Sequence, residues 1–408
     1  MTRHVVVMVT SSYPRFHGDS VGTFMEPIAH SVAARGHEVH VVAPWHPRVA
    51  RAEREGGVHF HFYKYAPHPA LNVFGYAEAM RADVSLRGAA FAAAPLAMAA
   101  GWRAARHVAD RHNATIVHGH WVIPGGAIAL AAAGPRPLVI SLHGSDVYVA
   151  EKLAPARFVA RRVFRRAAAV TACSSDLAER AVRLGADAAR VEVIPYGVDV
   201  DRFRPDPSSR SKLRDLLQLG ADDVLVVAAG RLVRKKGFEY LVEAMAQTAA
   251  TPRVVLALAG EGDLRDELRT RIAAAGLDQR VRLLGNQTQD EVARWLAAAD
   301  IAAVPSVRDD SGNVDGLPNV VLEALASATP LVTTPAGGIG AVVESGRTAI
   351  VVPERDAGAL ARAIQMLAAD PEQRARIGGA ARELAGRRFG WAETARRLEA
   401  AYDHALAK

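Results

Sequence analysis

The sequence predicts an α/β protein built from two doubly wound, Rossmann-like domains. Short apolar runs alternate with polar or glycine-containing turns and with longer segments of helical periodicity, and both halves of the chain show this rhythm. The pattern is typical of parallel sheets that are covered by helices. The chain has 408 residues, which is more than a single hydrophobic core usually holds, so we expect two domains.

Apolar runs bounded by turns give the predicted strands. In the first half they span residues 4–10, 38–43, 58–63, 115–118, 138–142, 169–171 and 191–194. In the second half they span residues 224–229, 253–259, 281–284, 301–304, 331–333 and 349–352. The predicted helices between them include 22–35, 238–248, 264–275 and 288–298. Prolines, serines and aspartates interrupt the pattern at 195–210, where we place the link, and we expect ligands in a cleft between the carboxyl ends of the strands.

The composition narrows the class of protein. The net charge is +7, which fits a solvated arginine-rich surface, an anionic substrate or an anionic lipid surface. We expect no nucleic-acid partner, because the sequence has no zinc-ligand spacing, RNP-like aromatic set or basic tail. The single cysteine, Cys173, allows no internal disulfide and favours a reducing compartment. With no signal peptide and no apolar stretch long enough to span a bilayer, we expect a cytoplasmic protein.

The segment from residue 304 to 333 is the strongest functional lead. A short apolar strand opens into a loop rich in Asp and Gly, and a helix is predicted from Pro318 to Ser327 because proline suits the first helical turn. Asp315 precedes this helix, and Glu323 lies on its second turn, about 7 Å further along the axis. The amino end of a helix favours a phosphate. Two carboxylates beside such a site can hold the hydroxyls of a ribose and of a sugar.

Two turns of the second half also suit a nucleotide. Arg231 and Lys236 follow the strand 224–229, where a guanidinium and an ammonium can neutralise a diphosphate, although a solvated basic turn is the alternative. The strand 253–259 ends in the sequence GEGD, where Gly260 would let the backbone approach a ligand closely. No Walker sequence occurs at either turn, and no G-x-G-x-x-G follows the first strand, which disfavours simple NTPases and NAD-dependent dehydrogenases.

Histidines mark two strand ends of the first half. His118 and His120 lie in VHGHW, and His143 lies in SLHGSDV, before a flexible glycine. This position makes His143 a candidate for the reaction, whereas a structural role is the alternative. His118 and His120 could serve as metal ligands, but no further ligand occurs at a suitable spacing. We therefore predict no metal site.

Motifs along nearly the whole chain carry a resemblance to a known family. They include GTFMEPIAHSVAARGHEVHVVAP, VHGHW, SLHGSDV, VIPYGVDVDRF, GRLVRKKGFEYLVEA, LAGEGDLRDEL, AADIAAVPS, DGLPNVVLEALA and FGWAETARRLEAAY. Together they resemble the retaining nucleotide-sugar glycosyltransferases of the GT-B fold, family four. The resemblance implies an acceptor-binding domain over 1–200, a donor-binding domain over 201–385, and a helix over 386–408 that crosses back to the first domain.

The resemblance also implies a role for each candidate residue. Arg231 and Lys236 would bind the donor diphosphate. Glu323 would hold the ribose and Asp315 the donor sugar, while His143 would lie near the anomeric carbon. Further donor contacts are implied for residues that bring the backbone or a side chain close to the nucleotide or its phosphates: Gly22, Gly260, Glu261, Asn319 and Val320. The sequence departs from the family pattern at Asp315, where Glu is usual, at Leu317-Pro318, where many members have Phe-Gly, and at Tyr196, where Asn is commoner.

The implied reaction is transfer of a sugar with retention of anomeric configuration, without a metal or other cofactor. The co-substrate would be a nucleoside diphosphate sugar, with UDP or GDP as the expected nucleotide. The acceptor would be a sugar or a lipid-linked group in polysaccharide, glycolipid or cell-envelope synthesis. A soluble-sugar synthase or phosphorylase of the same family is one alternative. A non-catalytic protein that binds nucleotide sugars is another.

Residues 151–170 raise the question of a membrane. Five arginines alternate there with Phe158, Val159, Val163 and Phe164. As a helix the segment is basic and amphipathic, which is the pattern of helices that lie on membrane surfaces. Peripheral contact with the anionic inner face of a membrane is one reading, and an ordinary helix that covers a sheet is the other.

Overall fold

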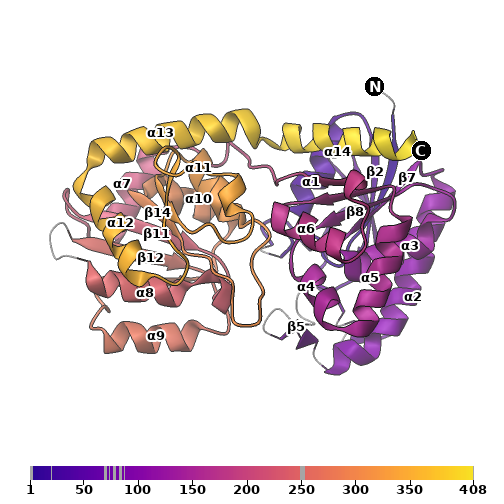
Figure 1. The fold of residues 1–408 in the computed structure, drawn as a ribbon, viewed down its shortest axis with the longest axis horizontal. Helices are drawn as coiled ribbons and strands as arrows, with labels where there is room; N and C mark the ends of the chain where they lie inside the picture. Colours follow the sequence, from indigo (N-terminus) through magenta and orange to yellow (C-terminus); the bar gives the residue numbers. More distant parts are fainter. Residues whose placement is uncertain are drawn as a thin grey trace. The chain divides into compact units, whose positions relative to one another are not determined.

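The chain divides into two compact units in a computed structural model that describes residues 3–19, 21–68, 71–72, 74–76, 80–81, 85–86, 88–248 and 253–407. The first unit comprises Met1–Tyr196 and Trp391–Lys408, and the second comprises Gly197–Gly390 (Figure 1). Each unit holds a parallel sheet with helices packed against it, so the predicted α/β class is confirmed. The chain passes from the first unit to the second after Tyr196, within the proline- and aspartate-rich segment 195–210, and returns to the first unit after Gly390.

The first unit is organised around a sheet with the strand order β10-β9-β8-β7-β1-β2-β4-β3. All neighbouring strands are parallel except β3, which pairs antiparallel with β4. The strands are β1 (Val5–Val9), β2 (Glu38–Pro44), β3 (Arg54–Glu55), β4 (Val58–Tyr63), β7 (Ile116–His120), β8 (Leu138–Leu142), β9 (Ala169–Ala172) and β10 (Val191–Val193). Nearly continuous apolar runs such as VVVMV in β1 are buried, as expected for strands covered on both faces.

Helices connect and cover these strands. They are α1 (Met25–Ala34), α2 (Gly88–Arg111), α3 (Ala127–Ala133), α4 (Ser145–Lys152), α5 (Ala154–Arg166), α6 (Ser175–Arg183) and α14 (Trp391–Leu406), with short turns η2 (Val122–Gly126) and η3 (Ala188–Arg190) and a small hairpin of β5 (Met80–Arg81) and β6 (Ser85–Leu86). The last helix, α14, contacts α1 and belongs to the first unit. Its Tyr402 is buried, with the hydroxyl 2.9 Å from Nδ1 of His118 on β7.

The second unit repeats the plan with a sheet of order β13-β12-β11-β14-β15-β16, all parallel. The strands are β11 (Val224–Ala229), β12 (Val254–Ala259), β13 (Val281–Gly285), β14 (Ile301–Val304), β15 (Leu331–Thr333) and β16 (Ala349–Val351). The helices are α7 (Pro207–Leu216), α8 (Phe238–Gln247), α9 (Arg265–Ala274), α10 (Gln289–Ala298), α11 (Asn319–Ala326), α12 (Ala357–Ala369) and α13 (Pro371–Arg388), with short turns η4 (Arg234–Lys236) and η5 (Ile339–Ala341).

The strand order places one topological switch point in each sheet. The chain winds outward in both directions from the β1–β7 pair in the first unit and from the β11–β14 pair in the second. Ligands of doubly wound sheets bind beside such points, at the carboxyl ends of the strands. The turn after β11 carries Arg231 and Lys236, and the loop after β14 carries Asp315. Arg231, Lys236 and Asp315 therefore follow the two strands at the switch point of the second unit.

Some predicted boundaries were wrong, for physical reasons. Residues 151–170 do not form one helix, because Pro155 has no N–H to bond the preceding turn, and α4 ends at Lys152 before α5 begins. Helix α11 begins at Asn319, with Pro318 in an extended conformation as its N-cap. Helix α1 begins at Met25, after a turn that contains Gly22. The two-residue strand β3 is too short to produce a periodic signal.

Among the described residues, no helix is both long enough and apolar enough to cross a membrane.

Candidate functional site

The turn after β11 is held against the loop after β14. Gly237 ends the short η4 turn with a φ of +66°, and a Cβ at this position would lie 2.0 Å from the carbonyl oxygen of Pro305. Only glycine permits both the backbone conformation and this close approach. The backbone N–H of Val307 donates to the carbonyl of Lys235 at 2.9 Å. These contacts fix the basic turn beside the Asp- and Gly-rich loop.

Two lysines of this turn face one carboxylate. The Nζ atom of Lys236 lies 2.6 Å from Oδ2 of Asp315, and Nζ of Lys235 lies 3.2 Å from Oδ1. All three side chains are largely buried, with exposed fractions of 13% for Lys236, 7% for Lys235 and 12% for Asp315. Two ammonium groups thus face this one carboxylate in a partly desolvated cluster. It is suited to an anion.

A glycine holds the backbone of Asp315 in place. Gly337 has a φ of +60°, and a Cβ there would lie 1.9 Å from the carbonyl oxygen of Asp315. Four residues after Asp315, α11 begins, and no described side chain caps its amino end. Asn319 and Val320 are the first two residues of α11, where backbone N–H groups lack partners within the helix. An anion near this end would also meet the positive end of the helix dipole.

Glu323 lies one turn further along α11, in a low-dielectric environment. Burial raises the pKa of its carboxyl to about 7, and the positive charges of Arg202 and Lys236 oppose this shift. A carboxyl with this pKa exchanges its proton near neutral pH, which is uncommon for glutamate. Lys236 thus acts on both carboxylates, since it bonds Asp315 and attracts the ionised form of Glu323. The structure brings these three predicted residues together.

Three further predicted donor residues lie on the turns that follow β11 and β12. Arg231 is exposed on the turn that follows β11. A Cβ at Gly260 would lie 1.9 Å from the carbonyl oxygen of Gly230, so glycine is required there by the packing of two strand ends. Glu261 is about half exposed and forms an ion pair with Arg265. Their donor-binding roles stay predictions.

In the first unit, His143 lies in an aromatic cluster. Its Nε2 is 3.0 Å from Nδ1 of His120, and its Nδ1 is 2.9 Å from the hydroxyl of Tyr196. The ring of Phe24 lies 4.8 Å from the His143 ring and stacks on Tyr196 at 4.9 Å. Burial lowers the pKa of His143 to about 3, so the imidazole is neutral at physiological pH. Tyr196, one of the departures from the family pattern, therefore bonds the candidate histidine directly.

Gly22 belongs to the turn that leads into α1. Its φ is +66°, and a Cβ there would lie 3.2 Å from Oγ of Ser12. The carbonyl of Gly22 accepts a hydrogen bond from the N–H of Met25 at 2.9 Å. Glycine is therefore needed for the backbone of this turn, and contact with the donor phosphates stays a prediction.

Side-chain hydrogen bonds give His118 a structural role. The hydroxyl of Tyr402, whose pKa is raised by burial, lies 2.9 Å from Nδ1 of His118. Nε2 of His118 in turn lies 2.7 Å from Oγ of Ser141. Both ring nitrogens of His118 are thus occupied by a structural network. Neither of the two groups of potential metal ligands among the described residues contains His118 or His120.

Two further residues were missed in the sequence. Lys235 bonds Asp315 as described. It belongs to a run of three basic residues, 234–236, from which only Lys236 was predicted to bind the donor. Asp146, in the SLHGSDV motif, is buried, and its Oδ2 accepts from the N–H of Val122 at 2.5 Å and its Oδ1 from the N–H of Gly144 at 3.3 Å. Burial raises the pKa of Asp146 to about 7, against the effect of these hydrogen bonds. It ties the turn before α4 to the turn after β7.

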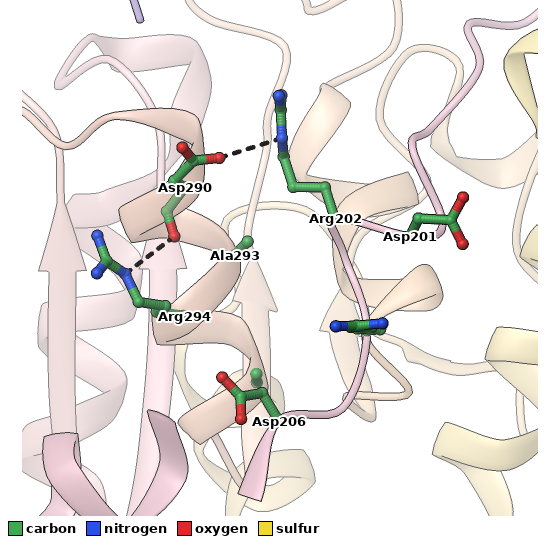
Figure 2. Close-up of a pocket in the computed structure, with 8 residues that line it drawn as sticks. Asp201, Arg202, Asp206, Asp290, Ala293 and Arg294 are labelled. Carbon is green, nitrogen blue, oxygen red and sulfur yellow. Dashed lines mark hydrogen bonds and ion pairs between the residues drawn. The ribbon is translucent and has the colours of Figure 1, made fainter. Parts of the chain in front are cut away.

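A separate pocket of about 350 Å³ lies in the second unit (Figure 2). It is lined by charged residues of the segment that leads into α7 and of α10: Asp201, Arg202, Arg204, Asp206, Asp290 and Arg294. Arg202 bonds Asp290 at 3.1 Å and Gln289 at 2.6 Å. None of the predicted donor residues lines this pocket.

Comparison with known proteins identifies relatives over the whole chain. The profile described as Glycosyltransferase Family 4 matches residues 21–202, and that described as Glycosyl transferases group 1 matches residues 209–384. A GDP-mannose-dependent α-(1-6)-phosphatidylinositol monomannoside mannosyltransferase of Mycobacterium tuberculosis is 30% identical over 403 residues, which cover 96% of each chain. A D-inositol 3-phosphate glycosyltransferase of Xylanimonas cellulosilytica is 34% identical over 296 residues, which cover 69% of each chain.

Solved structures share the fold. HepE of Anabaena in complex with UDP superimposes with a TM-score of 0.77 at 22% identity, covering 98% of this chain and 99% of that one. Sucrose-phosphate synthase of Thermosynechococcus elongatus superimposes with a TM-score of 0.80 at 22% identity, covering 100% of both chains.

Proposed function

Because this chain belongs to glycosyltransferase family 4, with the GT-B fold, we propose that it transfers a hexose from a nucleoside diphosphate sugar, with retention, to an acceptor that contains inositol phosphate. The observation that carries the proposal is the pair of largely buried lysines, Lys235 and Lys236, that face Asp315 just before the uncapped amino end of α11. This cluster has the charge and the backbone donors that a diphosphate requires.

In this proposal the donor binds through its diphosphate and its two sugars. Lys236 and Arg231 neutralise the diphosphate, and the N–H groups of Asn319 and Val320 approach its oxygens. Glu323 accepts hydrogen bonds from the ribose hydroxyls, and Asp315 accepts from the hydroxyls of the transferred sugar. Because Asp is one methylene shorter than the usual Glu, contact at this position depends on the close backbone packing between Asp315 and Gly337.

The reaction breaks the bond between the anomeric carbon and the diphosphate oxygen and forms a bond from the acceptor oxygen on the same face. The proton of the acceptor hydroxyl passes to the departing diphosphate. The protein contributes position and charge stabilisation rather than a nucleophile. His143 is neutral at physiological pH and contributes no positive charge.

We propose that the lysines and the helix dipole take the place that a divalent metal has in other glycosyltransferases. Charge that develops on the leaving diphosphate would be neutralised by ammonium groups that are already in position. Transfer is therefore expected to continue in the presence of EDTA, at a temperature where the chain stays folded. A strict requirement for added Mg²⁺ or Mn²⁺ would contradict this part of the proposal.

The names of the relatives support the choice of substrates. One relative is named for GDP-mannose and for a phosphatidylinositol monomannoside, and another for D-inositol 3-phosphate. Both acceptors contain an inositol phosphate, which is an anion, and the chain carries a net charge of +7. We therefore propose GDP-mannose as the first donor to test and a role in the synthesis of envelope glycolipids. Free inositol phosphate is the second acceptor class.

A lipid-linked acceptor would bring the enzyme to a membrane surface, and α5 is the element that we propose for this contact. Arg157, Arg161 and Arg165 are exposed, and Phe158 is 59% exposed, whereas Val163 and Phe164 are buried in the core. The outward face is thus basic, with an aromatic side chain among the arginines, which suits an anionic surface. Flotation with anionic liposomes at low salt tests this contact, and an Arg161→Glu/Arg165→Glu variant that floats as well as the wild type would refute it.

The donor is tested by thermal unfolding with GDP-mannose, UDP-glucose, ADP-glucose and dTDP-glucose. A donor at about 100 times its Kd stabilises the folded state by about 2.7 kcal/mol, which raises the Tm by several degrees. We expect GDP-mannose to raise the Tm of the wild type by this amount and to leave the Tm of Glu323→Ala unchanged. Glu243→Ala, which changes an exposed glutamate on α8, is the matched control and should keep the full shift.

Transfer is then measured with radiolabelled donor and two acceptors, phosphatidylinositol mannoside in vesicles and soluble inositol phosphate. Product with the lipid alone assigns the chain to glycolipid synthesis, and product with the soluble acceptor assigns it to the second class. No donor shift and no product with any pair would refute the proposed function.

A further inference from the structure

Three histidines from separate segments meet on one face of the first sheet. Strands β2 and β4 are parallel neighbours, and their register pairs His40 with His59 and Val42 with His61. Because side chains alternate along a strand, His40, His59 and His61 share a face with Glu38. Helix α2 contacts both strands. His112 comes directly after α2 ends at Arg111, and its ring lies above that of His40, with centroids 4.0 Å apart.

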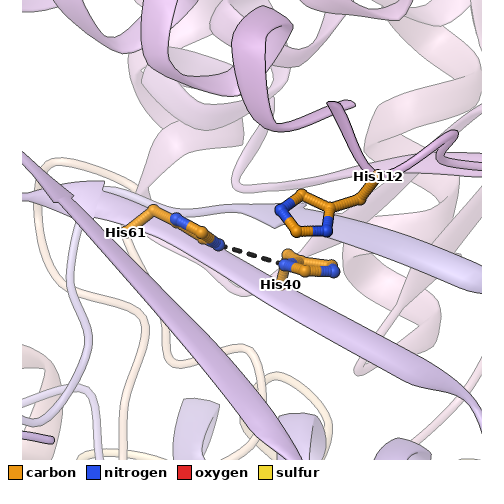
Figure 3. Close-up of side chains that lie close together, drawn as sticks. All are labelled: His40, His61 and His112. Carbon is orange, nitrogen blue, oxygen red and sulfur yellow. Dashed lines mark hydrogen bonds between the residues drawn. The ribbon is translucent and has the colours of Figure 1, made fainter. Parts of the chain in front are cut away.

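The ring nitrogens of the three residues converge. Nδ1 of His40 lies 3.0 Å from Nε2 of His61, and one nitrogen from each of His40, His61 and His112 lies within 4.8 Å of the other two. Figure 3 shows His61 facing His40 along their hydrogen bond, with the ring of His112 above that of His40. In a tetrahedral zinc site with Zn–N distances of 2.0–2.1 Å, ligand nitrogens stand about 3.3 Å apart. The nitrogens of the three residues, which lie no more than 4.8 Å apart, must approach one another by up to about 1.5 Å to reach that spacing.

The surroundings favour neutral imidazoles, the form that binds metal. Burial lowers the pKa of His40 and lowers that of His61 to about 4, with a further contribution from neighbouring histidines. Oε1 of Glu38 lies 3.0 Å from Nε2 of His40, on the side of the ring opposite to His61. A metal-bound histidine usually donates its other N–H to such a carboxylate, which fixes the tautomer and orients the ring.

We propose that His40, His61 and His112 bind one divalent transition-metal ion, best suited to zinc, which ties β2, β4 and the end of α2 together. His40 binds through Nδ1 while its Nε2–H donates to Glu38. His61 binds through Nε2, in place of the hydrogen bond that now joins it to His40. Three imidazoles leave a fourth position for solvent.

The site is separate from the residues assigned to transfer. His40 lies in the amino-terminal half of β2, and His112 precedes the start of β7. His120 and His143, by contrast, lie at or beyond the carboxyl ends of β7 and β8. The metal would therefore stabilise the first unit without taking part in the reaction.

A second group of potential ligands, His17, Glu26 and Glu55, does not support a metal in the same way. Nη1 of Arg51 lies 2.6 Å from Oε1 of Glu26 and 2.8 Å from Oε2 of Glu55. The buried guanidinium already neutralises these carboxylates. The histidine group has no such cation bonded to it among the described residues.

The experiment is a Co²⁺ titration of the full-length protein, without a polyhistidine tag, after removal of metals by a chelator. Visible absorption reports low-coordinate Co²⁺, and competition with Zn²⁺ gives the affinity for zinc. We expect one equivalent to bind to the wild type. His112→Gln, at a half-buried position in a turn, is expected to weaken binding at least 100-fold, and Glu38→Gln about 10–100-fold. His404→Ala, which removes an exposed histidine of α14, is the matched control and should bind as the wild type does.

X-ray absorption at the zinc edge tests the wild type itself, and so it does not depend on whether a variant folds. Three imidazole nitrogens at about 2.0–2.1 Å are expected. Failure of the wild type to bind Co²⁺ and Zn²⁺, fewer than two imidazoles around the zinc, or unchanged affinity in folded His112→Gln would each overturn the proposal.

Discussion

The Nζ atom of Lys236 lies 2.6 Å from Oδ2 of Asp315, so the cation assigned to the donor diphosphate is bonded to the carboxylate assigned to the donor sugar. Without donor, the two charges neutralise each other in a partly buried site, and Lys235 supplies a second cation at 3.2 Å. A diphosphate that draws Lys236 away would release Asp315 to accept a sugar hydroxyl. Binding of the two parts of the donor would then be coupled.

Replacement of Lys236 tests this coupling. Lys236→Ala removes a charge that would stabilise the leaving diphosphate, and the loss of one such group typically lowers the rate by about 10²–10³. We expect kcat to fall by this factor in transfer assays with GDP-mannose. Lys212→Ala, which removes an exposed lysine of α7 in the same unit, should leave kcat unchanged. Near-normal turnover by Lys236→Ala would remove Lys236 from the mechanism.

Gly337 offers a test that does not change any charge. In Gly337→Ala the new Cβ would meet the carbonyl oxygen of Asp315 at 1.9 Å, so the loop that carries Asp315 must move. We expect transfer to fall at least tenfold, because a small displacement of a positioning group has a large effect on the rate. The measurement is kcat/KM for the donor.

The matched control for this variant is Gly276→Ala. Gly276 has a φ of +64°, close to the +60° of Gly337, but a Cβ there meets nothing within 4 Å. In both variants the left-handed conformation of the new alanine lowers the stability of the fold by about 1–2 kcal/mol. Only Gly337→Ala also displaces Asp315. Equal activity in the two variants would show that the contact with Asp315 does not matter.

The sequence was sufficient for the class of fold and for the edge of the sheet that carries the candidate residues. Buried parallel strands can be recognised in the sequence as apolar runs. Polar residues that follow such a run lie at the carboxyl edge of the sheet. This placed Lys236 and Asp315 correctly on turns after β11 and β14. Their ion pair could not be predicted, because it depends on the adjacency of β11 and β14 in the sheet and on the fit of Gly237 against Pro305.

Local sequence was least informative where partners lie far apart in the chain. The alternation in VHFHFY indicates that His59 and His61 share a face, but the pairing of β4 with β2 and the placement of His112 require the tertiary fold. Asp146 was missed for the same reason, since its partner Val122 lies on another turn. The close approach of Gly230, which also requires glycine at position 260, could not be predicted for the same reason, and the ligand contact of Gly260 stays a prediction.

The pH dependence of donor binding is expected to follow Glu323. Its pKa is about 7 in the folded chain, and only the ionised form can accept from both ribose hydroxyls. About one tenth of the carboxyl is ionised at pH 6, whereas most of it is ionised at pH 8. The Kd for GDP-mannose should therefore be about tenfold higher at pH 6 than at pH 8. Glu323→Gln should bind weakly at both pH values. A pH-independent Kd in the wild type would contradict this assignment.

The same shift predicts the direction of a stability change. The folded pKa of Glu323 lies above its ordinary value of 4.5, so the folded state holds its proton more tightly than the unfolded state does. The resulting stabilisation is fully present below pH 4.5 and is lost as the pH rises through about 7. Without donor, Glu323→Gln should therefore raise the Tm relative to the wild type at pH 8 more than at pH 5.

Asp146 gives a prediction about stability in the first unit. Its buried carboxylate accepts from the backbone N–H groups of Val122 and Gly144. Asp146→Ala leaves the buried N–H of Val122 without this acceptor, which should cost about 1–3 kcal/mol in urea unfolding. Asp146→Asn retains an oxygen acceptor and should cost less. Because burial raises the pKa of Asp146 to about 7, the wild type should lose stability between pH 4 and pH 7, and the Asn variant should lose less.

Asp187→Ala is the control that separates burial from hydrogen bonding. Asp187 also accepts from a backbone N–H, that of Ala189 at 3.0 Å, but its side chain is 54% exposed. Water can replace the lost acceptor at this place, so the free energy of unfolding should fall by less than it does in Asp146→Ala. If the two alanine variants lose the same stability, desolvation of the Val122 N–H does not explain the effect. The carboxylate of Asp146 would then contribute no more to the free energy of unfolding than the exposed carboxylate of Asp187 does.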